Sequence, residues 1–427
     1  MNQAVDHNQA SDIVKQLTGA LHRLAKSNRA GADEARTVHR LELNLATLDP
    51  LLWLAAQPGE QKFYWRDQFE RAKVLLDIGA DPYIDIWLPD VEPHPDVKIK
   101  TWREKKGNEI LLTKEYHTPA GVLRQTVRET EDWCAPFHSN WIPTTFGVEK
   151  RTGYGMHLFD DHNVSRRTEP WVKGPEDLEK LKYVIRAPDG WKLDEWRMDA
   201  ERAMAFARQH NLFTTGCRTI VGDAFQWFCD IPWFMTQIYD NPGFVKQFFD
   251  IFQQWSKKLV ELALEVDVDF VQYRGWYEAP IYWGVKGFQK FLVPLVDEQA
   301  KMVHAAGKLH GYFLPEGQGL YAEVLRGMAS DVLMAVDPRM LHKGDLRDLF
   351  AKLGDQKSFW GGVNAEVTIQ SQDPETIDQA VKYAIESLGS NGGFILSSLI
   401  FSHYHPERGF ELLVEAWKKY RDMWAKA

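Results

Sequence analysis

Charged side chains that could do acid–base chemistry follow several short apolar runs of this chain. The first candidates are Asp90, Arg274, Glu278, Glu316 and Glu366. If the apolar runs are parallel strands, their carboxyl ends meet at one edge of a sheet or one mouth of a barrel. Carboxylates and an arginine brought together there suit general acid–base or metal chemistry. Any one of them could equally well cap a strand for structural reasons alone.

Histidines extend this set towards a metal site. His310 lies inside an apolar run, where it is as readily a core residue as a ligand, and His403 stands two residues before His405. Two residues so spaced in a strand share a face, as zinc ligands can. The candidate metal ligands are therefore His310, Glu316 and His403, although no cysteine follows Cys229.

Aromatic residues gather in two dense runs, 225–234 and 276–283, of a chain that contains 17 Trp. They indicate either a large core with a subunit interface or a pocket for a flat organic substrate. For such a pocket the substrate-binding candidates are Trp227, Trp276, Tyr277, Tyr312 and Glu366. Burial of Glu278 among aromatic rings would raise its pKa and let it exchange a proton near neutral pH, unless its side chain points to water.

The elements that position these residues alternate between strand and helix. From residue 241 onward, five short apolar runs are each coupled to an amphipathic segment, about every 30 residues, as in a parallel sheet covered by helices. No G-x-G-x-x-G or Walker A motif occurs. We predict an α/β fold, a single (β/α)8 TIM barrel over 79–427, with a doubly wound open sheet as the alternative.

Two segments do not follow this alternation. Residues 1–78 predict an N-terminal helical extension, because apolar residues recur there at helical spacing. Residues 98–128 contain three β-like runs separated by Gly107-Asn108 and Pro119-Ala120-Gly121, which predicts a β-meander. It opens an aromatic, turn-rich insertion over about 97–171.

Composition narrows the function classes. The 427 residues carry a net charge of −9, which gives no general attraction to nucleic acid or anionic membrane. No apolar stretch approaches a membrane span, and the first ten residues have no signal-peptide core. The three cysteines are too few for a disulfide framework. We therefore expect a cytoplasmic protein that acts on a small molecule.

Several segments, in this order and spacing, resemble the uroporphyrinogen decarboxylase superfamily, and in particular its methyltransferase-like branch. They include Gly79-Ala80-Asp81-Pro82-Tyr83, Gly222-Asp223-Ala224-Phe225, Gly287-Phe288-Gln289-Lys290-Phe291, Ala306-Gly307-Lys308-Leu309-His310-Gly311, Val336-Asp337-Pro338 and Gly392-Gly393-Phe394-Ile395-Leu396-Ser397. The resemblance covers residues from about 79 to the end. It implies a TIM barrel and a homodimer.

The resemblance implies methyl transfer more than decarboxylation. The decarboxylases carry an Arg-rich motif for substrate carboxylates, and none occurs before residue 79. The methyltransferases often bind zinc through a His-x-Cys strand and a later Cys; here His310-Gly311-Tyr312 keeps only the histidine. A zinc site of His and carboxylates would be more Lewis-acidic than one of thiolates and would suit an ether or amine.

The first hypothesis is thus transfer of a methyl group from a small O- or N-methylated compound, such as a methoxyarene, to a corrinoid protein or tetrahydrofolate. Asp90 or Glu278 would transfer a proton or orient the substrate. The alternative is a cofactor-independent decarboxylase, in which Asp90 stabilises a protonated ring and Arg274 holds a carboxylate. A third hypothesis is a binding barrel that has lost its chemistry.

Overall fold

A computed structural model describes residues 68–78, 80–129, 156–365, 367–390, 392–399 and 406–421. Its centre is a parallel sheet with the strand order β1-β6-β7-β8-β9-β10-β11. The strands are β1 (Tyr83–Trp87), β6 (Phe213–Ile220), β7 (Phe270–Arg274), β8 (Leu309–Phe313), β9 (Val332–Val336), β10 (Ser358–Asn364) and β11 (Phe394–Leu399). From β6 to β11, strands that lie side by side in the sheet also follow one another in the sequence, as in a TIM barrel.

One cluster of side chains shows that this sheet curls around an interior. Residues from all seven strands meet in it: Tyr83, Phe213, Phe270, Leu309, Val332, Met334 and Trp360, with Phe313 and Ile395 at its edge. Tyr83 on β1 contacts Trp360 on β10, with ring centroids 5.6 Å apart. Only a curled sheet brings strands so distant in the order together, which confirms the predicted α/β barrel fold; its described part contains seven of the eight expected strands.

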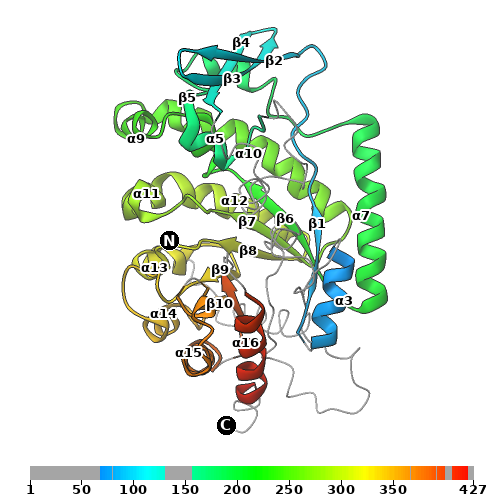
Figure 1. Cartoon of the computed structure of the whole chain (residues 1–427), viewed down its shortest axis with the longest axis vertical. Coiled ribbons are helices and arrows are strands. Elements are labelled where there is room, and N and C mark those ends of the chain that lie inside the picture. The colour runs from blue at the N-terminus through cyan, green and yellow to red at the C-terminus, as the bar shows by residue number, and fades with distance from the viewer. Residues whose placement is uncertain are drawn as a thin grey trace, which may run out of the picture.

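Helices cover the outer face of this sheet (Figure 1). They are α3 (Gln68–Ile78), α7 (Gly190–His210), α10 (Pro242–Glu265), α12 (Val293–Ala305), α13 (Gln318–Gly327), α14 (Leu346–Leu353), α15 (Pro374–Leu388) and α16 (Pro406–Tyr420). The pairs Asn241-Pro242 and Asp373-Pro374 are typical helix starts, and α10 and α15 begin there, because Asn241 and Asp373 accept hydrogen bonds from backbone N–H groups in the first turn. Among the described helices, none is long and apolar enough to cross a membrane.

A second, antiparallel sheet projects beyond the carboxyl end of β1 (Figure 1). It consists of β2 (Lys98–Lys106), β3 (Glu109–Thr118), β4 (Gly121–Arg128) and the short β5 (Arg167–Glu169). The predicted meander is confirmed, including its turn at Gly107, whose φ of 61° is readily adopted by glycine. β5 was not predicted, and it returns the chain to the barrel.

Short helices fill the connections. They are α5 (Asp161–Arg166), α6 (Asp177–Leu181), α8 (Ala224–Phe228), α9 (Ile231–Asp240), α11 (Pro280–Gly287), the π-helix η3 (Phe288–Leu292) and the 3-10 helix η4 (Ile369–Ser371). Two of them, α8 and α11, follow directly on the carboxyl ends of β6 and β7. The two aromatic runs of the sequence therefore lie in neighbouring βα connections at the barrel mouth.

Candidate active site

The candidate site is centred on a buried ion pair between the connections that follow β6 and β7. Asp223 and Arg274 are 0% and 3% exposed, and one Asp223 oxygen accepts a short hydrogen bond from Arg274 Nη1. The same carboxylate accepts from the backbone N–H groups of Trp276 at 3.0 Å and Tyr277 at 2.6 Å. Asp223 thus shapes the turn that carries Trp276 and Tyr277.

Burial and charge act against each other on Asp223. Burial raises its pKa to about 6, while the Arg274 guanidinium and the two backbone donors favour the charged form. A carboxyl group with such a pKa changes its protonation close to neutral pH, as acid–base chemistry requires.

Aromatic rings surround the Arg274 guanidinium. Its central carbon lies 5.3, 5.4 and 5.7 Å from the ring centroids of Trp227, Trp276 and Tyr277. Trp227 is 1% exposed and forms the back wall, whereas Trp276 and Tyr277 are partly exposed. Cation–π contacts of this kind hold the planar group in one orientation.

Asp161, at the start of α5, ties this aromatic wall to the chain that returns from the antiparallel sheet. One of its oxygens accepts from Trp227 Nε1 at 3.0 Å and from the Tyr277 hydroxyl at 2.5 Å. Nothing in the sequence around Asp161 predicted this, because the contact joins segments 116 residues apart.

Glu278 lies behind the barrel wall and not in the mouth. Its two oxygens accept hydrogen bonds from the hydroxyls of Tyr273, at 2.8 Å, and Tyr312. Val271 and Tyr273 pack into the outer core, whereas Phe270 is part of the interior cluster, so Tyr273 faces outward from β7. Glu278 is therefore placed to position its loop, and the catalytic role expected for it stays a prediction.

The environment predicted for Glu278 is nevertheless present. It is fully buried, and burial together with the nearby Asp223 carboxylate raises its pKa to about 8. The fit is close, because a Cβ on Gly222 would lie 1.9 Å from a Glu278 oxygen and one on Gly275 would lie 2.8 Å from the other. These two glycines are required by the approach of the carboxyl group.

The inward faces of the strands add polar groups below the ion pair. Asp85 on β1 accepts from the Thr215 hydroxyl of β6 at 2.8 Å and is 1% exposed. Its pairing with Thr215 follows the pairing of Tyr83 with Phe213, both in the interior cluster, so Asp85 faces the interior. Gln272, two residues before Arg274 on β7, faces the same way. Gln272 was not among the predicted site residues.

The other predicted site residues lie in different surroundings. Asp90 is exposed on the loop after β1, where its charge acts on Lys114 and Tyr116 of β3. Tyr312 is fully buried and faces Glu278, so it does not line the mouth. Glu366 lies outside the described residues.

The predicted metal ligands do not meet in the described part of the chain. His310 lies on the outer face of β8, where its Nδ1 is 3.2 Å from the Ser330 hydroxyl and burial lowers its pKa to about 3. Glu316 forms an ion pair with His342 at 2.7 Å, and His403 lies outside the described residues. The described residues contain no group of three metal-ligating side chains.

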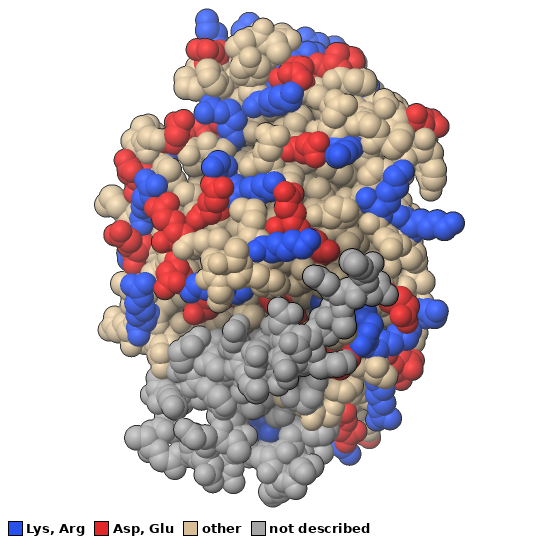
Figure 2. Space-filling model, turned by 180° about the vertical axis from the view of Figure 1, so that it is seen from behind, with Lys and Arg blue, Asp and Glu red and all other residues tan. Residues whose placement is uncertain are grey.

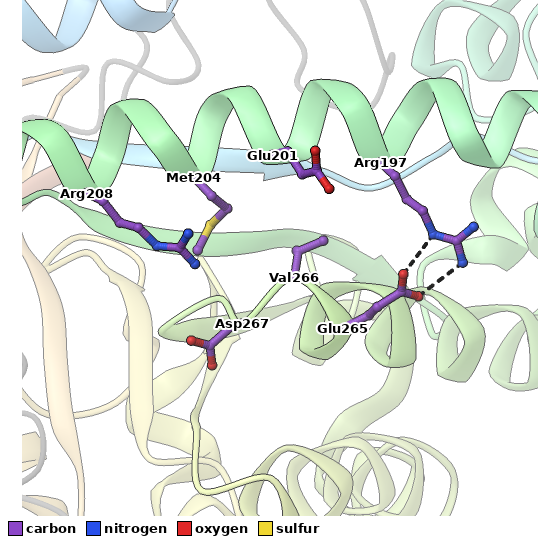
Figure 3. Close-up of a pocket in the computed structure, with 7 residues that line it drawn as sticks. All are labelled: Arg197, Glu201, Met204, Arg208, Glu265, Val266 and Asp267. Carbon is purple, nitrogen blue, oxygen red and sulfur yellow. Dashed lines mark hydrogen bonds and ion pairs between the residues drawn. The ribbon is translucent and has the colours of Figure 1, made fainter.

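A hollow of about 490 Å³ lies at the other end of the barrel (Figure 3). It is lined by Arg197, Glu201, Met204, Arg208, Glu265, Val266 and Asp267. These residues belong to α7, to the end of α10 and to the connection that leads from α10 into the amino end of β7. An Arg197–Glu265 ion pair, with a shorter N···O distance of 2.7 Å, closes one side. Active sites of TIM barrels form at the opposite, carboxyl end.

Surface charge gives this protein no single-sign face in the view from behind. Figure 2 shows Lys and Arg interspersed with Asp and Glu over the coloured part of that face. We therefore look for the residues that determine substrate specificity at the barrel mouth, where the buried Asp223–Arg274 ion pair lies.

Comparisons with known proteins match part of this chain to a family. Residues 226–420, slightly less than half of the chain, match the uroporphyrinogen decarboxylase (URO-D) family. A comparison with curated proteins gave no match. Among solved structures, a methyltransferase from Methanosarcina mazei is similar at a TM-score of 0.43 and 14% identity, over 52% of this chain and 64% of that one. This chain thus spans less than two thirds of that methyltransferase.

A B12-independent methionine synthase from Shewanella sp. W3-18-1, solved in complex with selenomethionine, is similar at a TM-score of 0.39 and 10% identity. That match covers 53% of this chain and 68% of the synthase. The matched family segment holds strands β7 to β11, Arg274 and Glu278. Over this segment the chain is similar to the uroporphyrinogen decarboxylase family.

Proposed function

We propose that this protein transfers a methyl group from a small O- or N-methylated compound, with a methoxyarene as the best fit, to a corrinoid protein or tetrahydrofolate. The observation that carries the proposal is the stack of Trp276 on Phe313 beside Arg274. Their ring centroids are 5.5 Å apart with an angle of 16° between the planes, and both side chains are partly exposed. A flat substrate ring can bind against such a surface.

In this reaction the bond between the methyl carbon and the aryl oxygen breaks, and the oxygen keeps the electron pair and takes a proton. The methyl carbon forms its new bond with the electron pair of the acceptor. We assign delivery of this proton, which is taken up from water, to Asp85, since its carboxyl group is buried on the inward face of β1 and accepts a hydrogen bond from the Thr215 hydroxyl. A mouth at the open end of the barrel leaves the acceptor room to approach.

The test is acceptor-dependent demethylation by the purified full-length chain. A panel of methoxybenzenes is incubated with cob(I)alamin or tetrahydrofolate, and the phenol and the methylated acceptor are measured by mass spectrometry. We expect equal amounts of both products, and an activity loss of at least about 100-fold in Asp85→Asn. Asp194→Asn, at a side chain that is 73% exposed, is the matched control. Formation of phenol without an acceptor would contradict the proposal.

Decarboxylation is the second candidate, because the matched family is that of uroporphyrinogen decarboxylase and a buried arginine can hold a carboxylate. It would release carbon dioxide without any methyl acceptor. Measuring released carbon dioxide with carboxylated substrates, in the absence of corrinoid and folate, separates the two reactions.

A further inference from the structure

Two neighbouring inward side chains of β7 carry donors without an acceptor. Within the described part of the chain, Arg274 Nη2 and Gln272 Nε2 have no hydrogen-bond partner. Both residues are buried, at 3% and 7% exposure. An unsatisfied buried donor lowers stability, and a charged one lowers it more. A site that keeps two such donors side by side is suited to a ligand that brings the acceptors.

The spacing of the donors limits what that ligand can be. Residues two apart on one strand are separated by roughly 7 Å along the strand and point to the same side. The ligand therefore needs two acceptor groups at opposite ends of a short rigid body, of the size that one aromatic ring provides. The outer acceptor meets a guanidinium and the inner one meets an uncharged amide.

The chemistry of the two donors indicates which acceptor group of the ligand each one binds. The Arg274 guanidinium is planar and always charged, and it pairs best with a carboxylate. Its Nη1 is already used by Asp223, so Nη2 is the position left for a ligand. The Gln272 amide suits a neutral oxygen such as that of an ether. The rings of Trp276 and Phe313 lie beside Arg274 and supply an apolar surface for the ring between the two groups.

We infer that the substrate is a methoxylated aromatic carboxylate, held by its carboxylate on Arg274 with its ether oxygen on Gln272. This inference rests on the proposed function and names the substrate class of that same site. The carboxylate stays on the product, because it serves for binding and only the methyl group leaves.

Equilibrium binding tests the inference separately from catalysis. The full-length chain is titrated calorimetrically with 4-methoxybenzoate, benzoate and methoxybenzene. We expect 4-methoxybenzoate to bind at least about tenfold more tightly than methoxybenzene, which corresponds to about 1.4 kcal/mol. Benzoate should fall between them, because it keeps the carboxylate and lacks the ether oxygen.

Two variants locate the carboxylate and the ether. Arg274→Lys keeps a positive charge for Asp223 but removes Nη2, and it should weaken binding of both carboxylates at least about tenfold. Gln272→Leu should weaken 4-methoxybenzoate and leave benzoate unchanged. Arg347→Lys, at a side chain that is 63% exposed, is the matched control, and thermal melts check that each variant folds.

The outcomes separate this inference from the proposed function. Methoxybenzene bound or demethylated as well as 4-methoxybenzoate would overturn the inference and leave methyl transfer standing. Tight binding of the carboxylates with the expected losses in both variants, but no methyl transfer to any acceptor, would support the site and refute the function. Absence of binding by either carboxylate would overturn the inference.

Discussion

The buried carboxyl group of Glu278 predicts an unusual dependence of stability on pH. Its pKa is about 8 in the folded protein and 4.5 as the ordinary value. Between those values the folded state keeps a proton that the unfolded chain has lost, so the free energy of unfolding falls as pH rises. The slope is at most about 1.4 kcal/mol per pH unit. Below pH 4.5 the group contributes no slope, and above about pH 8 its full cost is present.

Glu278→Gln removes this titration and keeps a polar group of the same shape between the two tyrosine hydroxyls. The amide oxygen can accept from Tyr273, which itself accepts from the Gly222 N–H at 3.1 Å, and the amide nitrogen can donate to Tyr312. From pH 5 to pH 8 the variant should therefore gain up to about 4 kcal/mol relative to the wild type. The steric fit around the amide is the same at each pH and cancels in this difference.

Urea unfolding of both proteins at pH 5, 6.5 and 8 measures the effect. Glu179→Gln, at a side chain that is 68% exposed, controls for loss of one surface carboxylate and should follow the wild type. Parallel curves of stability against pH for the wild type and Glu278→Gln would refute the reasoning, because they would mean that Glu278 is charged in the folded state.

Three further perturbations test the surroundings of the site. Tyr277→Phe removes the 2.5 Å hydrogen bond to Asp161 and should lower the free energy of unfolding by about 1–2 kcal/mol in urea titrations; an unchanged value would mean that water replaces the hydroxyl. Gly222→Ala should destabilise the protein by at least about 1–3 kcal/mol, because the new Cβ would lie 1.9 Å from the buried Glu278 carboxyl group. Gly327→Ala is the control and should be tolerated, because nothing lies within 4 Å of a Cβ at that position. Equal melting temperatures of the two variants would contradict the predicted steric clash at Gly222. The hydrogen bond to the buried Asp331 raises the pKa of His304, so the stabilisation from the charged imidazole is complete below pH 6.5 and is lost as pH rises through the raised pKa. His304→Gln should therefore lower the melting temperature most at acidic pH. A decrease in melting temperature that is the same at every pH would mean that His304 is not charged in the folded protein.

The sequence by itself determined the elements of this protein. Alternation of apolar strands and amphipathic helices predicted the parallel barrel, and caps such as Asn241 and Asp373 located the starts of α10 and α15. Glycine-containing turns predicted the antiparallel meander. These features depend on local periodicity and on backbone preferences, which short stretches of sequence contain. For the same reason the burial of Glu278 among aromatic residues could be predicted.

The tertiary structure alone decided which of the chemical side chains share a site. His310 and Gly311 are neighbours in β8, and only one of two successive strand residues can face the barrel interior. Because β8 is buried on both faces, its sequence does not alternate between apolar and polar residues, and it therefore does not show which of the two residues faces inward. That is why His310, expected as a possible ligand, lies on the outer face of its strand, and why Gln272, which was not predicted, faces inward. The pairing of Asp223 with Arg274, and the contact of Asp161 with Trp227, join residues 51 and 66 positions apart. Such pairs depend on how the strands are arranged around the barrel, and local sequence preferences contain no information about that arrangement.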